Sequence, residues 1–103
     1  MNFVFHPEAE TEFNQSIQYY EEITPRLGYD FAMEVYATIQ RSIALPKSWT
    51  ILSGDIRRSL VRRFPYGILY SEEANEIFII AVMNLHRHPD YWKQRKKQNL
   101  HEK

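Results

Sequence analysis

Two groups of side chains in the second half of the chain have the composition of a binding or catalytic surface. Four arginines fall on one run of strand-forming residues, and a His-Arg-His-Pro-Asp-Tyr-Trp segment follows a later run. Arginine binds phosphate and carboxylate groups through two parallel hydrogen bonds and stays charged near neutral pH. If both runs are strands of one antiparallel sheet, their ends lie close together. The sequence therefore predicts one surface that meets phosphate or acidic groups.

The first group consists of two arginine pairs, Arg57-Arg58 and Arg62-Arg63. Because side chains alternate along a strand, we expect Arg58 and Arg62 on one face, and Arg57 and Arg63 on the other. Two arginines on one face can clamp a phosphodiester or bind an acidic segment of a partner. The alternative is an edge strand whose charges prevent aggregation.

The second group follows the last strand-like run. His86 and His88 can act as acid or base near neutral pH, and Tyr91 can stack on a base or donate a proton. Arg87, between the histidines, can stabilise the charge of a phosphorane. Trp92 is expected to pack over the end of the sheet. No second ligand group stands at a spacing that fits a metal site, so neither a metal nor another cofactor is predicted.

Lys93 begins a basic run that continues to residue 97. Such a run can follow a phosphate backbone, although it is more often a solvated tail. We therefore predict a single domain over residues 1–95 and a basic tail over 96–103. The residues assigned to nucleic-acid or partner binding are Arg57, Arg58, Arg63, His88 and Lys93. The chain contains no glycine-rich phosphate loop and no nucleotide-binding fingerprint.

Hydrophobic periodicity indicates the elements that must position these groups. A short apolar run at 2–6 predicts a strand. Apolar residues repeat at helical spacing over 9–20 and again over 31–43, which predicts two helices joined by a short link at Pro25. Runs of strand-forming residues predict three further strands, at 56–62, 66–71 and 77–83.

The order β-α-α-β-β-β defines an α+β domain in which a helical hairpin packs on one face of a small antiparallel sheet. Residues 47–54 are expected to form a connector without regular structure. Glu10 and Glu12 lie off the apolar stripe of the first helix. The face of the sheet that the helices do not cover is then left for function.

Composition and charge narrow the class of protein. The chain has 103 residues, no cysteine and a net charge of zero. It therefore has room for one modest core and for no disulfide or thiolate metal site. Residues 1–46 carry two basic and seven acidic side chains, whereas residues 47–103 carry eleven basic and six acidic ones. No secretory signal and no membrane span are visible in the sequence, so we expect a cytoplasmic protein.

Three segments together resemble a known family. They are Val61-Arg62-Arg63-Phe64-Pro65-Tyr66-Gly67-Ile68-Leu69-Tyr70, Glu76-Ile77-Phe78-Ile79-Ile80-Ala81-Val82 and His86-Arg87-His88-Pro89-Asp90-Tyr91-Trp92. These segments are similar to the RelE/ParE superfamily of type II toxins, in the group often described as plasmid-stabilisation toxins. The resemblance implies a growth inhibitor that is held inactive by a cognate antitoxin protein.

Members of this superfamily act in two ways. RelE-like toxins cut mRNA in the ribosomal A site, and ParE-like toxins inhibit DNA gyrase. The first activity is the preferred interpretation. By resemblance, Arg62 and Arg87 would stabilise the pentavalent phosphate, and His86 or Tyr91 would move protons without a metal. Arg57 or Arg58 falls near the strand lysines of the nucleases.

Two alternatives remain open because the chain departs from the nuclease pattern. The net charge is zero, the strand lysines are missing, and Gly67 stands where nucleases often keep a further arginine. One alternative is a non-catalytic ParE-like inhibitor of DNA gyrase. The other is a detoxified relative that only binds its antitoxin.

Overall fold

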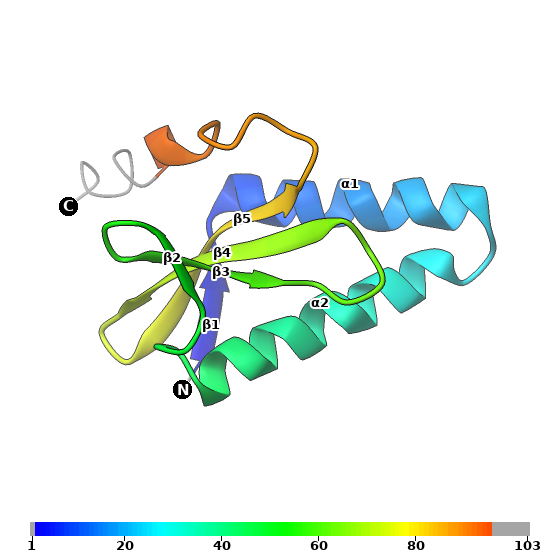
Figure 1. Cartoon of the computed structure of the whole chain (residues 1–103). Coiled ribbons are helices and arrows are strands. Elements are labelled where there is room, and N and C mark those ends of the chain that lie inside the picture. The colour runs from blue at the N-terminus through cyan, green and yellow to red at the C-terminus, as the bar shows by residue number, and fades with distance from the viewer. Residues whose placement is uncertain (1, 96–103) are drawn as a thin grey trace.

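The computed structural model describes residues 2–95, in which two helices pack against a five-stranded sheet (Figure 1). The helices are α1 (Pro7–Ile23) and α2 (Leu27–Ala44). The strands are β1 (Asn2–Phe5), β2 (Thr50–Ser53), β3 (Ile56–Leu60), β4 (Tyr66–Glu73) and β5 (Glu76–Asn84). The predicted α+β class is confirmed. The tail predicted at 96–103 lies outside the described residues.

Local chemistry sets the bounds of the helical hairpin. Pro7 occupies the first turn of α1, where its missing N–H costs nothing, and the Glu8 amide donates to His6 Nδ1 at 3.0 Å. At the link between the helices, the Glu21 carboxylate accepts hydrogen bonds from the amides of Arg26 and Gly28, at 2.9 and 3.0 Å. One side chain of α1 therefore caps the first turn of α2.

The strand order is β1-β5-β4-β3-β2, and two features of this sheet differ from the predictions. First, β1 pairs with β5 in parallel, so the sheet is mixed and not wholly antiparallel. Second, the segment expected to be a connector contains strand β2, which forms a hairpin with β3. All four residues of β2 are exposed. An exposed edge strand shows no alternation of apolar and polar residues, and this explains why periodicity missed it.

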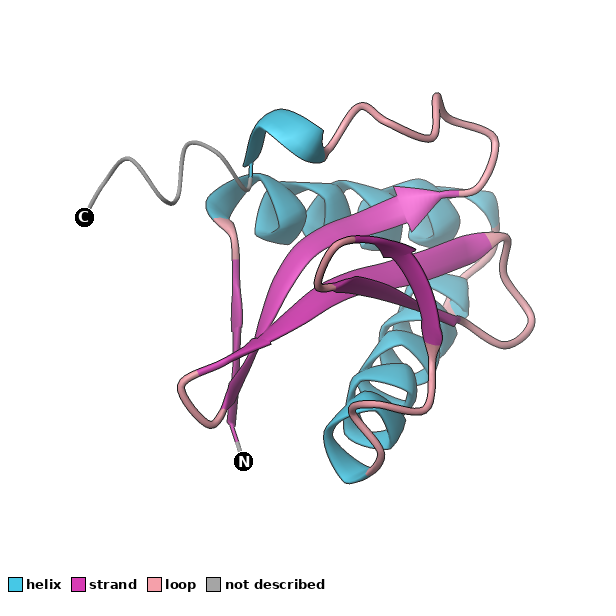
Figure 2. Ribbon diagram, turned by 60° about the vertical axis from the view of Figure 1, so that its left-hand side comes forward, coloured by secondary structure: helices cyan, strands magenta, loops and turns pink. Residues whose placement is uncertain are grey.

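Both helices lie on the same side of the sheet (Figure 2). The main core fills the space between them and the sheet, with buried side chains that include Phe13, Phe31, Val35, Ile68, Tyr70 and Ile79. A second, smaller cluster lies on the opposite face and consists of Ile56, Leu69, Ile80, Ala81, Met83 and Trp92. We call this opposite side the open face. Within residues 2–95, no helix combines the length and apolarity that a membrane crossing requires.

After β5 the chain turns back and runs towards the beginning of α1 (Figures 1 and 2). This C-terminal segment, residues 85–95, ends in a short helical turn at 93–95. Trp92 is 3% exposed and packs in the open-face cluster, while its indole N–H donates to the Pro89 carbonyl at 2.6 Å. The segment therefore covers part of the open face.

Candidate functional site

The two arginine pairs do not share one strand. Strand β3 ends at Leu60, so Arg62 and Arg63 lie in the following turn, where Arg63 has a left-handed φ of 72°. Arg63 forms an ion pair with Asp30 of α2 at 3.7 Å. The predicted strand was two residues too long, and the alternation that placed Arg58 and Arg62 on one face does not reach Arg62. Phe64 is buried in the main core, so this turn lies against the helical side of the molecule.

Arg57 and Arg58 do lie on β3, on opposite faces. Arg57 stands opposite Tyr70 of the main core, and its Nη1 donates to the Trp49 carbonyl at 2.8 Å. Arg58 stands opposite Leu69 of the open-face cluster. Arg57 thus holds the segment that precedes β2, whereas Arg58 faces the open side.

The residues of the second group are largely engaged with α1. Tyr91 donates its hydroxyl proton to Glu12 Oε2 at 2.6 Å. The Arg87 guanidinium lies 4.0 Å from the centre of the Tyr91 ring, and its Nη1 is 3.7 Å from the same carboxylate. Burial and the hydrogen bond to Glu12 raise the pKa of Tyr91. The tyrosine therefore keeps its proton at neutral pH.

The two histidines of this group and the neighbouring Lys93 are exposed. His86 lies at the turn after β5, where its backbone amide donates to Asn84 Oδ1 at 2.8 Å. His88 Nδ1 accepts a hydrogen bond from the Asp90 amide at 3.1 Å, and Lys93 forms an ion pair with Asp90 at 3.2 Å. These contacts stabilise the turns of the C-terminal segment. Their assignment to target binding stays a prediction.

Glu12 is the residue that periodicity placed off the apolar stripe, yet its side chain is only 12% exposed. Its Oε1 accepts from the Val82 amide at 3.0 Å and from Arg95 Nη1 at 2.9 Å, and its Oε2 accepts from Arg95 Nη2 at 2.8 Å. Arg95 also donates to the Ile80 carbonyl at 3.0 Å. Glu12 and Arg95 therefore form hydrogen bonds with backbone groups of β5 in the part of that strand that does not pair with β1. Nothing in the sequence pattern marks either residue for this position.

A polar groove lies between α1 and the end of β5. One hollow of about 180 Å³ is lined by Glu12, Gln15, Ser16, Tyr66, Val82, Asn84 and Arg87. A neighbouring hollow of about 400 Å³ shares four of these residues and adds Tyr19, Tyr20, Pro65 and His86. We call the two together the α1–β5 groove. Burial and the proximity of Tyr66 raise the pKa of Tyr20 to about 12. Amide, hydroxyl and aromatic side chains line this groove, and its one arginine faces a carboxylate.

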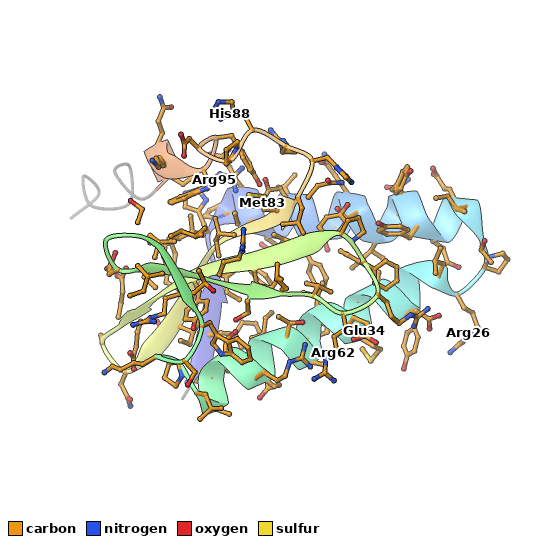
Figure 3. All side chains as sticks on the ribbon, viewed as in Figure 1. Arg26, Glu34, Arg62, Met83, His88 and Arg95 are labelled. Carbon is orange, nitrogen blue, oxygen red and sulfur yellow. The ribbon has the colours of Figure 1, made fainter. Side chains whose placement is uncertain are left out.

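The expected convergence of the two groups is not seen for Arg62. Arg62 lies on the α2 side of the molecule, and His88 of the second group lies on the opposite side (Figure 3). The physical reason is the early end of β3, because the turn that follows carries Arg62 and Arg63 towards α2. The catalytic roles assigned to Arg62, Arg87, His86 and Tyr91 stay predictions, but these four side chains do not surround one shared hollow.

The comparisons with known proteins bear on the fold. No family model matches the chain, and neither does any curated protein. Among solved structures, the chain is similar to a chain of the chromosomal ParDE TA system from P. aeruginosa. The TM-score is 0.72, the identity is 12%, and the match covers 84% of this chain and 97% of that chain. This likeness shows that the two chains share one fold.

Proposed function

We propose that this protein is the toxin of a type II toxin–antitoxin system and that it acts by binding a protein target. The target proposed is DNA gyrase, and the cognate antitoxin is the second partner. Two findings support the first half of this proposal: the shared fold with a ParDE-system chain, and the sequence segments that resemble the RelE/ParE superfamily. Fold alone does not separate the two activities, so the choice of target depends on the site.

The observation that carries this choice is the separation of Arg62 from His88 of the second group (Figure 3), together with the engagement of Arg87 and Tyr91 by Glu12. Metal-independent cleavage of RNA needs a base for the 2′-hydroxyl, an acid for the leaving oxygen and cations around one phosphate. Here Arg87 and Tyr91 share the Glu12 carboxylate, and the raised pKa of Tyr91 opposes its use as a base. The arrangement suits recognition of a protein surface better than phosphoryl transfer.

Two assays with the purified protein test the proposal. We expect inhibition of DNA supercoiling by gyrase at excess toxin, and no new 5′ ends on a defined mRNA incubated with ribosomes. Cleavage at the ribosomal A site would overturn the choice of target. A known A-site nuclease and a known gyrase inhibitor serve as positive controls. Induction in cells should arrest growth, and co-expression of the antitoxin should relieve the arrest.

Substitution of the two arginines separates the mechanisms further. A nuclease would lose toxicity with either Arg62→Ala or Arg87→Ala, since both cations would act on one phosphate. In the proposed mechanism the two positions contribute to separate surfaces. We therefore expect the two variants to differ in toxicity by about tenfold or more, although both fold. Equal loss in both variants would contradict the proposal.

A further inference from the structure

Arg58 is the residue of the four-arginine group that has a buried nitrogen without a hydrogen-bond partner. Its aliphatic part lies over Gly67 of the neighbouring strand: a Cβ built at Gly67 would be 3.1 Å from both Cγ and Cδ of Arg58. That distance is tighter than ordinary van der Waals contact. Glycine at this position therefore makes room for the arginine to lie along the open face.

The polar end of Arg58 is not satisfied within the described part of the chain. Its Nε is buried and has no hydrogen-bond partner, and no carboxylate of residues 2–95 forms an ion pair with its guanidinium. By contrast, Arg57 is bonded to a backbone carbonyl, and Arg87 and Arg95 are paired with Glu12. A buried donor without a partner costs free energy, which a ligand with a suitable acceptor recovers.

The surroundings of Arg58 are apolar. Leu60, two residues further on the same face of β3, is 54% exposed. Leu85 lies on the other side, with its Cδ2 3.5 Å from the Cβ position of Gly67, and is 38% exposed. Leu60 and Leu85 are exposed on either side of Arg58. They exclude water from an acidic group that binds to this arginine. A carboxylate in such a place binds arginine more strongly than it would in open solvent.

We propose that Arg58, Leu60 and Leu85 bind a peptide segment of a partner protein in which an acidic residue is flanked by branched apolar residues. This inference rests on the proposed function, in which that segment belongs to the antitoxin. The geometry favours a peptide over RNA. An RNA strand requires a row of cations along its phosphates, and the leucines on both sides of Arg58 offer none.

The test uses the purified, ¹⁵N-labelled chain and a small probe, N-acetyl-Leu-Glu-Leu-amide. The Arg58 Nε–H group and the amides of Leu60, Gly67 and Leu85 report on binding by NMR. We expect these signals to shift on titration, with a dissociation constant on the order of 1 mM. The matched Leu-Gln-Leu probe should bind about tenfold more weakly because it lacks the charge. Equal shifts with both probes, or no shift with either, would overturn the proposal.

Three variants locate the site. Arg58→Met removes the guanidinium and keeps the aliphatic part, and it should abolish the difference between the two probes. Gly67→Ala should weaken binding of the Glu probe several-fold by displacing the arginine. Arg26→Gln is the matched control, since it removes an exposed arginine at the link between α1 and α2 and should leave binding unchanged. Backbone spectra show whether each variant is folded.

A short oligouridylate tests the competing ligand. If it shifts the same signals, and Arg58→Met removes that effect, the site binds RNA and the proposal fails. The probe assay is independent of toxicity, so its failure is distinguishable from that of the proposed function. If the protein inhibits supercoiling but does not bind the probe, the proposed peptide site is refuted and the proposed function is not. Probe binding without any growth arrest would support the surface and refute the toxin assignment.

Discussion

At the scale of single residues, the carboxylate of Glu12 accounts for most of the order in the C-terminal segment. It accepts hydrogen bonds from the Val82 amide, the Tyr91 hydroxyl and two nitrogens of Arg95. The side chain of Arg95 is 8% exposed, so both charges of this pair are largely withdrawn from water. Removing one partner of such a pair leaves the other charge uncompensated.

Glu12→Gln should therefore lower the free energy of unfolding by about 3 kcal/mol, because among the described residues Arg95 then keeps only the exposed Glu8 carboxylate, 3.6 Å from its Nε, as a counter-ion. Chemical denaturation measures this loss. Glu10→Gln is the matched control, since Glu10 lies exposed on the same helix and should change stability by less than about 0.5 kcal/mol. Similar stability of both variants would show that the network contributes little.

The environment of Tyr91 predicts that the free energy of unfolding depends on pH. Burial and the hydrogen bond to Glu12 raise the pKa of Tyr91 in the folded chain above its ordinary value of 10.0. Above pH 10, the unfolded chain releases this proton and the folded chain retains it, so stability falls as the pH rises. In Tyr91→Phe the fall should be shallower, by up to about 1.4 kcal/mol per pH unit, which corresponds to one proton. Identical slopes in denaturation series above pH 10 would contradict this assignment.

Residue types were the more predictable part of the candidate site. The sequence indicates which arginines, histidines and tyrosines could bind a partner, because their chemistry is independent of the fold. It does not indicate that Glu12 points at β5, since this depends on the rotation of α1 against a sheet built from distant residues. It also does not indicate that Arg58 is free while Arg57 is bonded, since the two differ only in the face of β3 they occupy.

At the scale of elements, the two helices and three of the later strands follow from periodicity. The exposed strand β2 and the direction of β1 do not, because neither leaves a pattern along its own sequence. The end of β3 matters most for function. Val61 extends the strand pattern and buries its side chain in the main core as alternation predicts, but the strand itself ends at Leu60. This difference of two residues separates Arg62 from the remaining candidates.

The helical hairpin gives a prediction at this scale. A Cβ at Gly28 would lie 2.5 Å from the Ile17 carbonyl oxygen, which is backbone and cannot move without shifting α1. Gly28→Ala should therefore destabilise the protein by about 2 kcal/mol, although alanine favours helices. Gly54→Ala is the comparison variant. A Cβ at Gly54 would meet no atom within 4 Å, so only the positive φ of this residue opposes the alanine. Thermal unfolding of the two variants decides this, and a Gly28→Ala protein as stable as the parent would contradict the close packing.

At the scale of the whole molecule, several basic side chains are paired with acidic ones of the same chain. The chain has thirteen basic and thirteen acidic side chains, and Arg63, Arg87, Lys93 and Arg95 each face a carboxylate of the same chain. Proteins that bind nucleic acid without sequence preference rely on many unpaired cations along one surface. The ion pairs of these four side chains leave fewer cations available for phosphate contacts.

We therefore expect weak binding to RNA. Fluorescence anisotropy with a short labelled RNA at about 50 mM salt should give a dissociation constant weaker than about 100 µM. Tight binding that falls by about a thousandfold at 200 mM salt would instead indicate several phosphate contacts. That outcome would favour the nuclease interpretation over a protein target.

The parallel pairing of β1 with β5 has a consequence for how the protein is made. Asn2 lies opposite Glu76 and Phe5 lies opposite Ile79, so the first strand to leave the ribosome has no partner until more than seventy further residues have been synthesised. Until then, the nascent helices have no completed sheet on which to bury their apolar stripes. Under the proposed function, this order of assembly keeps the inhibitory fold unfinished while the message is being translated, and an antitoxin then has time to meet the chain before the fold is complete.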